Sequence, residues 1–438
     1  MAGKECAVSY FRITGGKQLS GVFTPAGNKN AALPILAGAL LTTELVRVEN
    51  VPEIRDVETL LELLRSIGAE ADWVDPGVVE VRAADLEGGT QLDPELAGRI
   101  RASVLLAGPL LARLGAFELA QPGGDFIGRR RLDTHLLVLQ SLGANVAAGS
   151  GYFLHTNGLQ GTSIFLDEPS VTGTENAILA AVTASGTTEL RNAATEPHVR
   201  DLCDFLQVLG ARINGIGTNT LMIEGVETLG GGTFRLGADH IEVGSVIGLA
   251  VATRSTLRIA DVSQRDFDPL RIGFQRLGVT FQWDGDQLLV LGDAELEIQP
   301  DIGDQIPKIY DGPWPAFPAD LTSIALVAAT QCYGTILIHE KMFESRMFFV
   351  DKVVAMGGRV VLCDPHRAVV VGPSTLRGSR LESPDIRAGM ALVIAALAAK
   401  GASQIHNIRQ IDRGYERIHE RLTELGAEID RVPERIGS

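Results

Sequence analysis

The sequence has little cysteine and no excess of positive charge. Its four cysteines, Cys6, Cys203, Cys332 and Cys363, lie far apart and form neither a CxxC pair nor a zinc-like cluster with histidine. We therefore expect reduced thiols, no bound metal and a cytoplasmic protein. The formal net charge of −15 argues against a general nucleic-acid binder or a membrane-surface protein.

Long hydrophobic runs are also missing. The longest apolar stretches, 31–41 and 388–399, fall short of the roughly 20 residues that a membrane-spanning helix needs, so they favour buried helices. The N-terminal stretch has no apolar signal core. The sequence has no GxGxxG motif after a strand pattern and no P-loop. It therefore contains neither of these two nucleotide-binding motifs. We expect no cofactor at all.

One pattern recurs along the chain, in which a helical segment ends in a hydrophobic–Gly–small triplet and a short strand follows. Glycine directly after a helix is a C-cap signal, because it tolerates the left-handed conformation. Examples of the expected strands are Tyr152–His155 beyond a triplet, and 44–48 and Thr256–Ile259 ahead of a helix. The six triplets are Ile67-Gly68-Ala69, Leu142-Gly143-Ala144, Leu209-Gly210-Ala211, Leu277-Gly278-Val279, Met356-Gly357-Gly358 and Leu425-Gly426-Ala427.

A second, very apolar helix leads into each of the strands that precede these units, most clearly at 176–184 and 321–330. The units recur about every 70 residues, which is too long for a solenoid of thin repeats. Three units could close one compact domain, with apolar helices inside and strands as walls. The pattern therefore predicts two similar α/β domains of three units each.

A loop rich in glycine and arginine is the strongest local sign of chemistry. Pro122, Gly123 and Gly124 predict a loop that carries Asp125, and three arginines follow at 129–131. Backbone N–H groups and guanidinium groups together suit an anionic substrate, and a lone acid beside them is a candidate proton carrier. The alternative is a solvated surface loop with basic residues.

Seven ordered motifs, from about residue 15 to the C-terminus, resemble the UDP-N-acetylglucosamine 1-carboxyvinyltransferase family. They are Gly27-Asn28-Lys29-Asn30-Ala31-Ala32-Leu33-Pro34-Ile35-Leu36, Arg101-Ala102-Ser103, Pro122-Gly123-Gly124-Asp125-Phe126-Ile127-Gly128, Pro315-Ala316-Phe317-Pro318-Ala319-Asp320, Phe343-Glu344-Ser345-Arg346, Asp385-Ile386-Arg387-Ala388 and Ile411-Asp412-Arg413-Gly414-Tyr415-Glu416-Arg417.

The resemblance implies the enolpyruvyl-transferase fold, an inside-out α/β barrel with two domains of three repeated units. It implies a first domain at 29–238 and a discontinuous second domain at 1–28 plus 239–438. The implied reaction transfers the enolpyruvyl group of phosphoenolpyruvate to the 3′-hydroxyl of UDP-N-acetylglucosamine and releases phosphate, as the first committed step of peptidoglycan synthesis. The expected partners are these two small molecules, with no nucleic acid, no membrane and no obligate protein partner.

The resemblance also assigns residues to the two substrates and to catalysis. Phosphoenolpyruvate would be held by Lys29, Asn30, Arg130, Arg387 and Arg413. UDP-N-acetylglucosamine would contact Asn30, Arg101, Arg130, Arg131, Leu132, Asp133, Thr134, Ser170, Val171, Asp320 and Met342. The catalytic set would be Asp125, Asp320, Lys29 and Arg413, with Asp320 taking the proton of the sugar hydroxyl.

Asp125 departs from the commonest family pattern, which has cysteine at this place. A carboxyl can replace a thiol as proton donor if it holds its proton near neutral pH. We expect Asp125 to gain proton affinity when phosphoenolpyruvate neutralises the arginines around it. The antibiotic fosfomycin acts on this family by alkylating the cysteine, so the resemblance implies that this chain resists it.

Other readings stay open. One rival is an enolpyruvyl transferase with another acceptor, either shikimate 3-phosphate or a uridine monophosphate. The signature of the shikimate enzyme pairs lysine with serine, whereas this chain has Lys29-Asn30. A rival of another class is a silent homologue that binds a UDP-sugar and regulates cell-wall synthesis, although Lys29, Asp320, Arg387 and Arg413 are all present.

Overall fold

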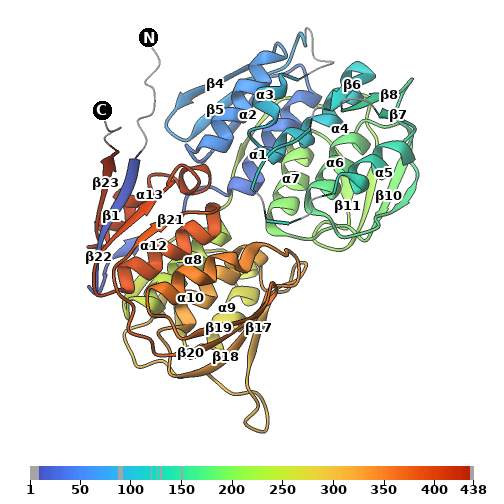
Figure 1. Ribbon diagram of the computed structural model, residues 1–438. Helices are drawn as coiled ribbons and strands as arrows, with labels where there is room; N and C mark the ends of the chain where they lie inside the picture. Colours follow the sequence, from blue (N-terminus) through green and yellow to red (C-terminus); the bar gives the residue numbers. More distant parts are fainter. Residues whose placement is uncertain are drawn as a thin grey trace. The chain divides into compact units, whose positions relative to one another are not determined.

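The computed structural model describes residues 9–86, 92–119, 121–125, 127–128, 131–148 and 151–434. The described chain divides into two compact units (Figure 1). Unit 1 comprises the described residues up to Ala26, then Ile127 and Gly128, and those from Ala238 on. Unit 2 comprises Gly27 to Asp125 and the described residues from Arg131 to Gly237. The boundaries predicted above, at 29–238, stay a prediction about the domains.

Three apolar helices form the centre of unit 1 and pack against one another: α8 (His240–Ala252), α10 (Thr322–Ala329) and α12 (Ile386–Ala398). Every residue of α8 and α10 is buried, as expected of helices that are apolar on all sides. Glycine allows their close approach. A Cβ atom on Gly244 would lie 2.3 Å from the side chain of Leu321, and one on Gly248 would lie 2.2 Å from that of Ile324.

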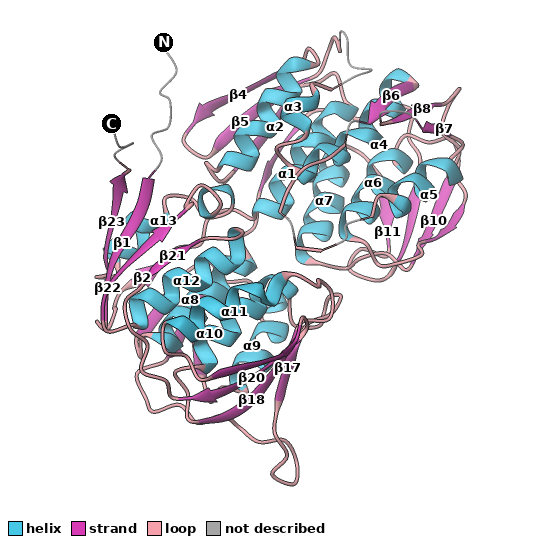
Figure 2. Cartoon of the chain, in the orientation of Figure 1, coloured by secondary structure: helices cyan, strands magenta, loops and turns pink. Residues whose placement is uncertain are grey.

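Three four-stranded sheets belong to unit 1. Their strand orders are β15 (Thr280–Asp284), β16 (Gln287–Leu291), β14 (Thr256–Ile259), β2 (Val22–Phe23); β17 (Lys308–Tyr310), β18 (Gly334–His339), β20 (Arg367–Gly372), β19 (Val360–Asp364); and β21 (Arg380–Glu382), β22 (Gly401–His406), β1 (Ser9–Gly15), β23 (Glu428–Pro433). Each apolar helix packs on one sheet: α8 on β14 and β16, α10 on β18 and β20, and α12 on β22 and β1 (Figure 2). The N-terminal strand β1 thus completes the C-terminal repeat.

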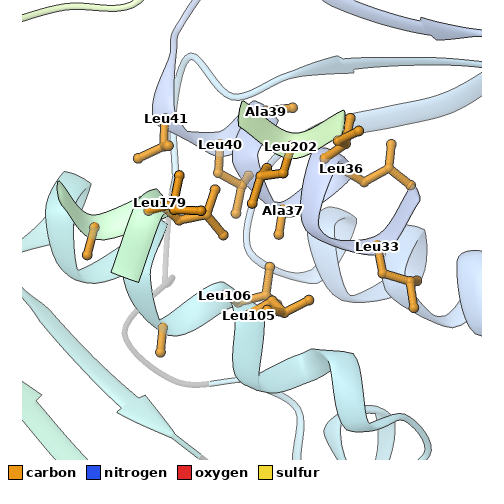
Figure 3. Close-up of a cluster of buried hydrophobic side chains, with 14 of the residues drawn as sticks. Leu33, Leu36, Ala37, Ala39, Leu40, Leu41, Leu105, Leu106, Leu179 and Leu202 are labelled. Atoms are coloured by element: carbon orange, nitrogen blue, oxygen red, sulfur yellow. The ribbon is translucent and has the colours of Figure 1, made fainter. Parts of the chain in front are cut away.

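Unit 2 repeats the plan with its own apolar helices, α1 (Lys29–Gly38), α4 (Ala107–Leu114) and α6 (Val171–Ala181). Leu36, Leu106, Leu179 and Leu202 are among the side chains that meet in its core (Figure 3). Its described sheets are β13 (Gly232–Arg235), β3 (Val46–Glu49), β5 (Val78–Arg82), β4 (Glu70–Asp75); β11 (Arg212–Asn214), β12 (Thr220–Glu224), β10 (Thr187–Arg191), β9 (Ser163–Phe165); and β6 (Ala116–Leu119), β8 (Tyr152–His155), β7 (Asn145–Ala148).

Six further helices carry the predicted glycine caps. They are α2 (Arg55–Ser66), α5 (Asp133–Ser141), α7 (Pro197–Val208), α9 (Asp268–Gln275), α11 (Val350–Ala355) and α13 (Ile418–Glu424). The glycine after each has a positive φ, from 83° at Gly278 to 104° at Gly210. The sixfold repeat predicted from the triplets is therefore confirmed. The short helical elements are α3 (Pro94–Ala97), η1 (Ala39–Leu41), η2 (Arg101–Leu106), η3 (Gln264–Asp266), η4 (Ala319–Leu321), η5 (Arg346–Phe349) and η6 (Ile411–Arg413).

The apolar runs and the cysteines also have defined places. The two longest apolar stretches lie in α1 with η1 and in α12. In the described parts of the chain, no helix has both the length and the apolar character needed to cross a membrane. Cys203, Cys332 and Cys363 are free thiols, and burial raises the pKa of Cys203 and of Cys332 to about 12. Cys6 lies outside the described residues.

Candidate active site

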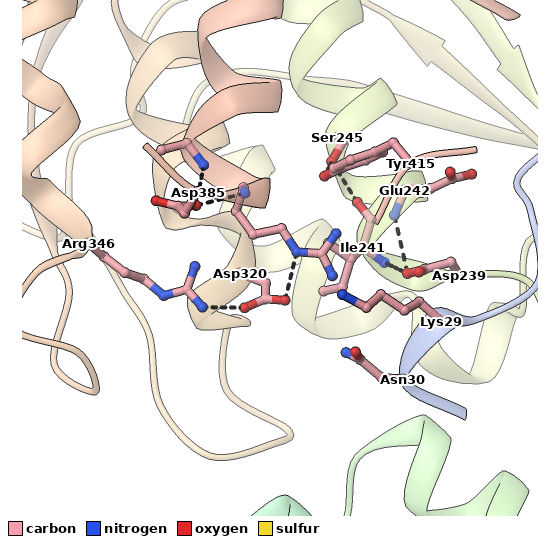
Figure 4. A network of polar contacts seen from close by, with 12 residues as sticks. Lys29, Asn30, Asp239, Ile241, Glu242, Ser245, Asp320, Arg346, Asp385 and Tyr415 are labelled. Atoms are coloured by element: carbon pink, nitrogen blue, oxygen red, sulfur yellow. Dashed lines mark hydrogen bonds and ion pairs between the residues drawn. The ribbon is translucent and has the colours of Figure 1, made fainter. Parts of the chain in front are cut away.

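Asp320 lies between two arginines in unit 1 (Figure 4). Its Oδ1 is 2.5 Å from Nη2 of Arg346, and its Oδ2 is 2.8 Å from Nε of Arg387. The arginine side chains are 10% and 5% exposed, whereas the Asp320 side chain is 26% exposed. The carboxylate is therefore the member of this group that a solute can reach.

The starts of two packed helices bring this group together. Asp320 lies in η4, directly before α10, and Arg387 is the second residue of α12. The N-cap residue Asp385 accepts hydrogen bonds from the backbone N–H groups of Arg387 (2.8 Å) and Ala388 (2.9 Å), which fixes the first turn of α12. The helices α10 and α12 pack together, and the pair between Asp320 and Arg387 shows that their starts lie close to each other.

Both arginines keep their charge despite burial. Burial by itself lowers the pKa of Arg387, but Asp320, Tyr415 and Asp239 together more than offset this and raise it above the ordinary value. Asp320, with added help from Glu340, likewise raises the pKa of Arg346 despite its burial. The Arg387 guanidinium also lies over the ring of Tyr415, 5.3 Å from its centroid. Unit 1 thus holds two fixed cations beside one accessible carboxylate.

Two other predicted residues lie in unit 1. Arg413 is half-buried at the end of η6, and its Nη1 donates to Oε1 of Gln410 at 3.0 Å. Met342 follows β18, the residue is 40% exposed, and its backbone N–H donates to Oδ2 of Asp311 at 3.2 Å. Asp311 was not predicted from the sequence. Arg346 belongs to one of the seven family-like motifs, but no role was predicted for it.

Lys29 forms a buried ion pair in unit 2. It is the first residue of α1, and its Nζ is 2.7 Å from Oδ2 of Asp56, with side-chain exposures of 8% and 7%. Asn28 caps the helix by accepting the N–H of Asn30, which is half-buried. Sequence reasoning missed Asp56, because an acid in the first turn of a helix is common for helix-dipole reasons alone.

The loop that carries Asp125 is held close to the end of α3. The N–H of Gly123 donates to the carbonyl of Ala97, and a Cβ on Gly123 would lie 1.8 Å from the carbonyl oxygen of Gly98. Gly124 has φ of 107°, so both glycines are needed for this path. Asp125 is half-buried. Arg130, which sequence reasoning placed in the site, lies outside the described residues.

The predicted contacts for the uridine diphosphate gather at the starts of α5 and α6, which pack together. Arg101 Nη2 donates to the carbonyl of Arg131 at 2.9 Å, and Arg131 pairs with Asp133 at 2.8 Å. Asp167 links the two helix starts, because it accepts from Thr134 Oγ1 at 2.7 Å and pairs with Arg131 at 3.7 Å.

The remaining members of this group are apolar or act as caps. Ser170 is the N-cap of α6, and its Oγ accepts the N–H of Gly173 at 3.2 Å. Leu132 is buried and Val171 is half-buried. The structure thus brings together 131–134, 170–171 and Arg101, which are separated by up to about 70 positions in the sequence.

Comparison with known proteins gives consistent matches along the whole chain. The family model described as EPSP synthase (3-phosphoshikimate 1-carboxyvinyltransferase) matches residues 13–422. Proteins named UDP-N-acetylglucosamine 1-carboxyvinyltransferase are 60% identical in Bradyrhizobium diazoefficiens (97% of this chain, 98% of the relative) and 52% identical in Treponema denticola (95% and 98%).

Solved structures agree at the level of the fold. The crystal structure of the enolpyruvyl transferase NikO from Streptomyces tendae matches with a TM-score of 0.85 at 25% identity, covering 98% of this chain and 100% of that chain. A structure of EPSP synthase from Acinetobacter baumannii matches with a TM-score of 0.71 at 16% identity, covering 97% and 99%. These likenesses confirm the predicted enolpyruvyl-transferase fold.

Proposed function

The chain belongs to the UDP-N-acetylglucosamine 1-carboxyvinyltransferase family, and from this we propose the reaction that its residues carry out. It transfers the enolpyruvyl group of phosphoenolpyruvate to the 3′-hydroxyl of UDP-N-acetylglucosamine and releases phosphate, in peptidoglycan synthesis. The observation that carries the proposal is the accessible Asp320 carboxylate between the buried guanidinium groups of Arg346 and Arg387.

Asp320 is the proposed base for the sugar hydroxyl. The two arginines fix its orientation, and its exposure leaves it open to the acceptor. It removes the hydroxyl proton as the sugar oxygen forms a bond to C2 of phosphoenolpyruvate. A positioned base of this kind typically contributes a factor of about 10² to 10⁴ in rate.

Asp125 is the proposed acid. It gives a proton to C3 of phosphoenolpyruvate while the sugar oxygen adds to C2, which produces a tetrahedral ketal. In the elimination step, C3 returns a proton to the Asp125 carboxylate, and the bond between C2 and the phosphate oxygen breaks. Phosphate leaves and the enolpyruvyl double bond is restored. The tight path of the loop, with glycine at 123 and 124, supports a fixed place for this carboxyl group.

Cations hold phosphoenolpyruvate, which carries a phosphate and a carboxylate on three carbons. We assign this task to Lys29, Arg387 and Arg413, with Asn30 and Arg130 added on the family pattern alone. Preorganised charges stabilise the charge that shifts during addition and elimination. The burial of Lys29 with Asp56, and of Arg387 with Asp320, supports the assignment because neither cation has to be ordered when the substrate binds.

The uridine diphosphate is assigned to Arg101, to 131–134 and to the start of α6 at Ser170 and Val171, with Met342 at the sugar. The first turns of α5 and α6 present backbone N–H groups, and helix N-termini favour anions such as a diphosphate. We also propose 29–238 and 1–28 plus 239–438 as the two domains of the enzyme.

The first test measures phosphate release from phosphoenolpyruvate with one acceptor at a time. We expect release with UDP-N-acetylglucosamine and none with UMP or shikimate 3-phosphate. Release with UMP or shikimate 3-phosphate instead would move the protein to another pathway. Binding of UDP-N-acetylglucosamine without any release would favour a silent, regulatory homologue.

The acid role of Asp125 has its own test, which uses fosfomycin. Wild-type protein should form no covalent adduct, because a carboxylate at this place lacks the thiol that the drug alkylates. Asp125→Cys should keep measurable turnover and gain one adduct by intact-mass spectrometry, whereas Asp125→Asn should lose turnover by about 10² to 10⁴. A stable adduct on wild type, or an Asp125→Asn enzyme with the pH profile of wild type, would contradict the assignment.

A further inference from the structure

Two buried carboxyl groups lie side by side at the end of one sheet in unit 1. Strands β17 and β18 are parallel, with Tyr310 paired to His339, so the next residues, Asp311 and Glu340, leave the sheet together. Both side chains are fully buried, with 0% exposure. Full burial of two acids is rare, and it requires compensating partners.

The partners are successive backbone N–H groups of one segment. Lys341 N–H donates to Oδ1 of Asp311 at 2.5 Å and Met342 N–H to its Oδ2 at 3.2 Å. Phe343 N–H donates to Oε1 of Glu340 at 3.1 Å. The two carboxyl groups therefore take up all three N–H groups of 341–343.

The Glu340 carboxyl group holds a proton that it shares with Asp311. The acid that raises the proton affinity of Glu340 by a side-chain hydrogen bond is Asp311. Two carboxylate oxygens repel each other, so this contact becomes a hydrogen bond when Glu340 is protonated. Burial, followed by Asp311, raises the pKa of Glu340 to about 9.

The other groups that face Glu340 do not change its assignment as the protonated acid. Arg346, from η5, acts in the opposite direction and favours the ionised form, as does the hydroxyl of Thr322 from α10. The His366 ring lies 2.8 Å from the backbone carbonyl of Glu340 and therefore touches the main chain. Glu340 thus supplies the proton of the pair.

We propose that Asp311 and Glu340 are positioning residues, a proton-sharing carboxyl pair that holds 341–343 in the conformation that receives the UDP-sugar. The proposal rests on the proposed function, in which Met342 contacts that substrate. Aromatic contacts support the same segment: Lys341 Nζ lies 3.7 Å from the ring centroid of Tyr310, and the Arg346 guanidinium lies 5.0 Å from that of Phe343. Arg346 in turn pairs with Asp320.

The test compares two amide variants that remove one carboxyl each. Asp311→Asn places an NH₂ group against backbone N–H groups, so we expect the KM for UDP-N-acetylglucosamine to rise roughly tenfold to hundredfold, with the KM for phosphoenolpyruvate unchanged. Glu340→Gln keeps a neutral donor toward Asp311 and an acceptor toward Phe343 N–H, so both KM values should stay near wild type.

The control is Asp93→Asn. Asp93 Oδ1 also accepts two successive backbone N–H groups, those of Glu95 (2.8 Å) and Leu96 (3.3 Å), but at α3 in unit 2. Asparagine is as good an N-cap as aspartate, so neither KM should change. Thermal unfolding of each variant shows whether it is folded.

The pH profile gives a readout that a merely structural role would not move. In wild type, the KM for UDP-N-acetylglucosamine should rise as the pH passes about 9 and the shared proton is lost. In Glu340→Gln this alkaline rise should disappear. This comparison remains decisive even if Asp311→Asn does not fold.

Three results would overturn the proposal while the wild type stays active. They are an unchanged KM for the UDP-sugar in Asp311→Asn, an equal rise for both substrates, and an alkaline rise that persists in Glu340→Gln. Failure of the proposed function looks different, because the wild type itself would then release no phosphate with UDP-N-acetylglucosamine.

Discussion

The three repeats of unit 1 each place an aspartate at the start of the apolar helix, but the three aspartates have different partners. Asp239 is the N-cap of α8 and accepts the N–H of Ile241 at 2.7 Å. Asp385 is the N-cap of α12 and accepts the N–H of Arg387 at 2.8 Å. Asp320 caps no helix, and both of its oxygens pair with arginines.

A short 3-10 turn accounts for the difference. The element η4 (Ala319–Leu321) precedes α10, so the residue at the N-cap position of α10 is Leu321, which has no capping side chain. The Asp320 carboxylate is thereby displaced from the helix N–H groups and meets Arg346 and Arg387. In this repeat the aspartate does not cap the apolar helix, so the Asp320 carboxylate is available for chemistry.

Unit 2 shows the same division between acids that hold a cation and residues that cap a helix. Its apolar helices α1 and α6 are capped by the neutral side chains of Asn28 and Ser170. Asp56, in the first turn of α2, holds the Lys29 cation instead. In both units, therefore, a proposed substrate cation, Lys29 or Arg387, is held by an acid that is not a helix N-cap.

The largest expected effect is the loss of turnover when Asp320 is replaced. Asp320→Asn keeps the shape but removes the base, so turnover should fall by about 10² to 10⁴. Thermal stability should also fall, because the buried Arg346 and Arg387 lose their counter-charge. Steady-state phosphate release measures the turnover. Asp93→Asn is the matched control, because asparagine still caps α3. An Asp320→Asn enzyme as active as the control would refute the base assignment.

Asp56→Ala extends the comparison to unit 2. It leaves Lys29 buried without its carboxylate, which should lower the free energy of unfolding by about 3–5 kcal/mol. Denaturant titration gives this value. Glu95→Ala removes the exposed partner of Arg99, with side-chain exposures of 79% and 50%, and should cost under about 1 kcal/mol. An equal loss of unfolding free energy in the two variants would show that burial does not make the pair of Lys29 and Asp56 more stabilising than an exposed pair.

Glu340 gives a pH-dependent effect of intermediate size. Its pKa is raised from 4.5 to about 9 on folding, so between these values the folded state keeps a proton that the unfolded state has lost. Its contribution to stability is fully present below about pH 4.5 and is lost as the pH rises through 9.

Glu340→Gln should remove this part of the pH dependence. The unfolding free energy of wild type, relative to that of the variant, should therefore decrease steadily between pH 5 and pH 9, as measured by denaturant titration at several pH values. A constant difference across this range would mean that Glu340 is ionised in the folded protein at neutral pH.

The smallest expected effect is the loss of stability when the N-cap of α8 is removed. Asp239→Ala removes the acceptor for the N–H groups of Ile241 and Glu242 at the start of α8. It should lower the free energy of unfolding by about 1 kcal/mol, while Asp239→Asn costs only a few tenths. Thermal melts of the two variants decide this, and a loss in Asp239→Asn equal to that in Asp239→Ala would mean that the carboxylate charge, rather than the cap, matters.

Much of the fold could be predicted from local patterns. The glycines of the six triplets all end helices with positive φ, and the predicted strands Tyr152–His155 and Thr256–Ile259 have the bounds found in the structure. The expected strand at 44–48 lies instead at Val46–Glu49. Such patterns succeed because a helix cap and an alternating strand depend on near neighbours in the chain.

The partners within the site could not be read in the same way. Asp320 pairs with residues 26 and 67 positions away, and Asp311 with backbone groups about 30 positions away. The sequence does place an acid directly after β17 and another directly after β18. Their meeting depends on the register of the two strands, which sequence periodicity does not reveal.

By itself, the sequence determined the sixfold repeat, the apolar helices and the family, because these depend on short-range periodicity and on ordered motifs. Only the tertiary structure decided which acids cap helices and which hold cations. That choice depends on one extra turn before α10, on the packing of α10 against α12 and on the parallel pairing of β17 with β18. Each of these places side chains from distant segments within hydrogen-bond distance, where burial then sets their charge.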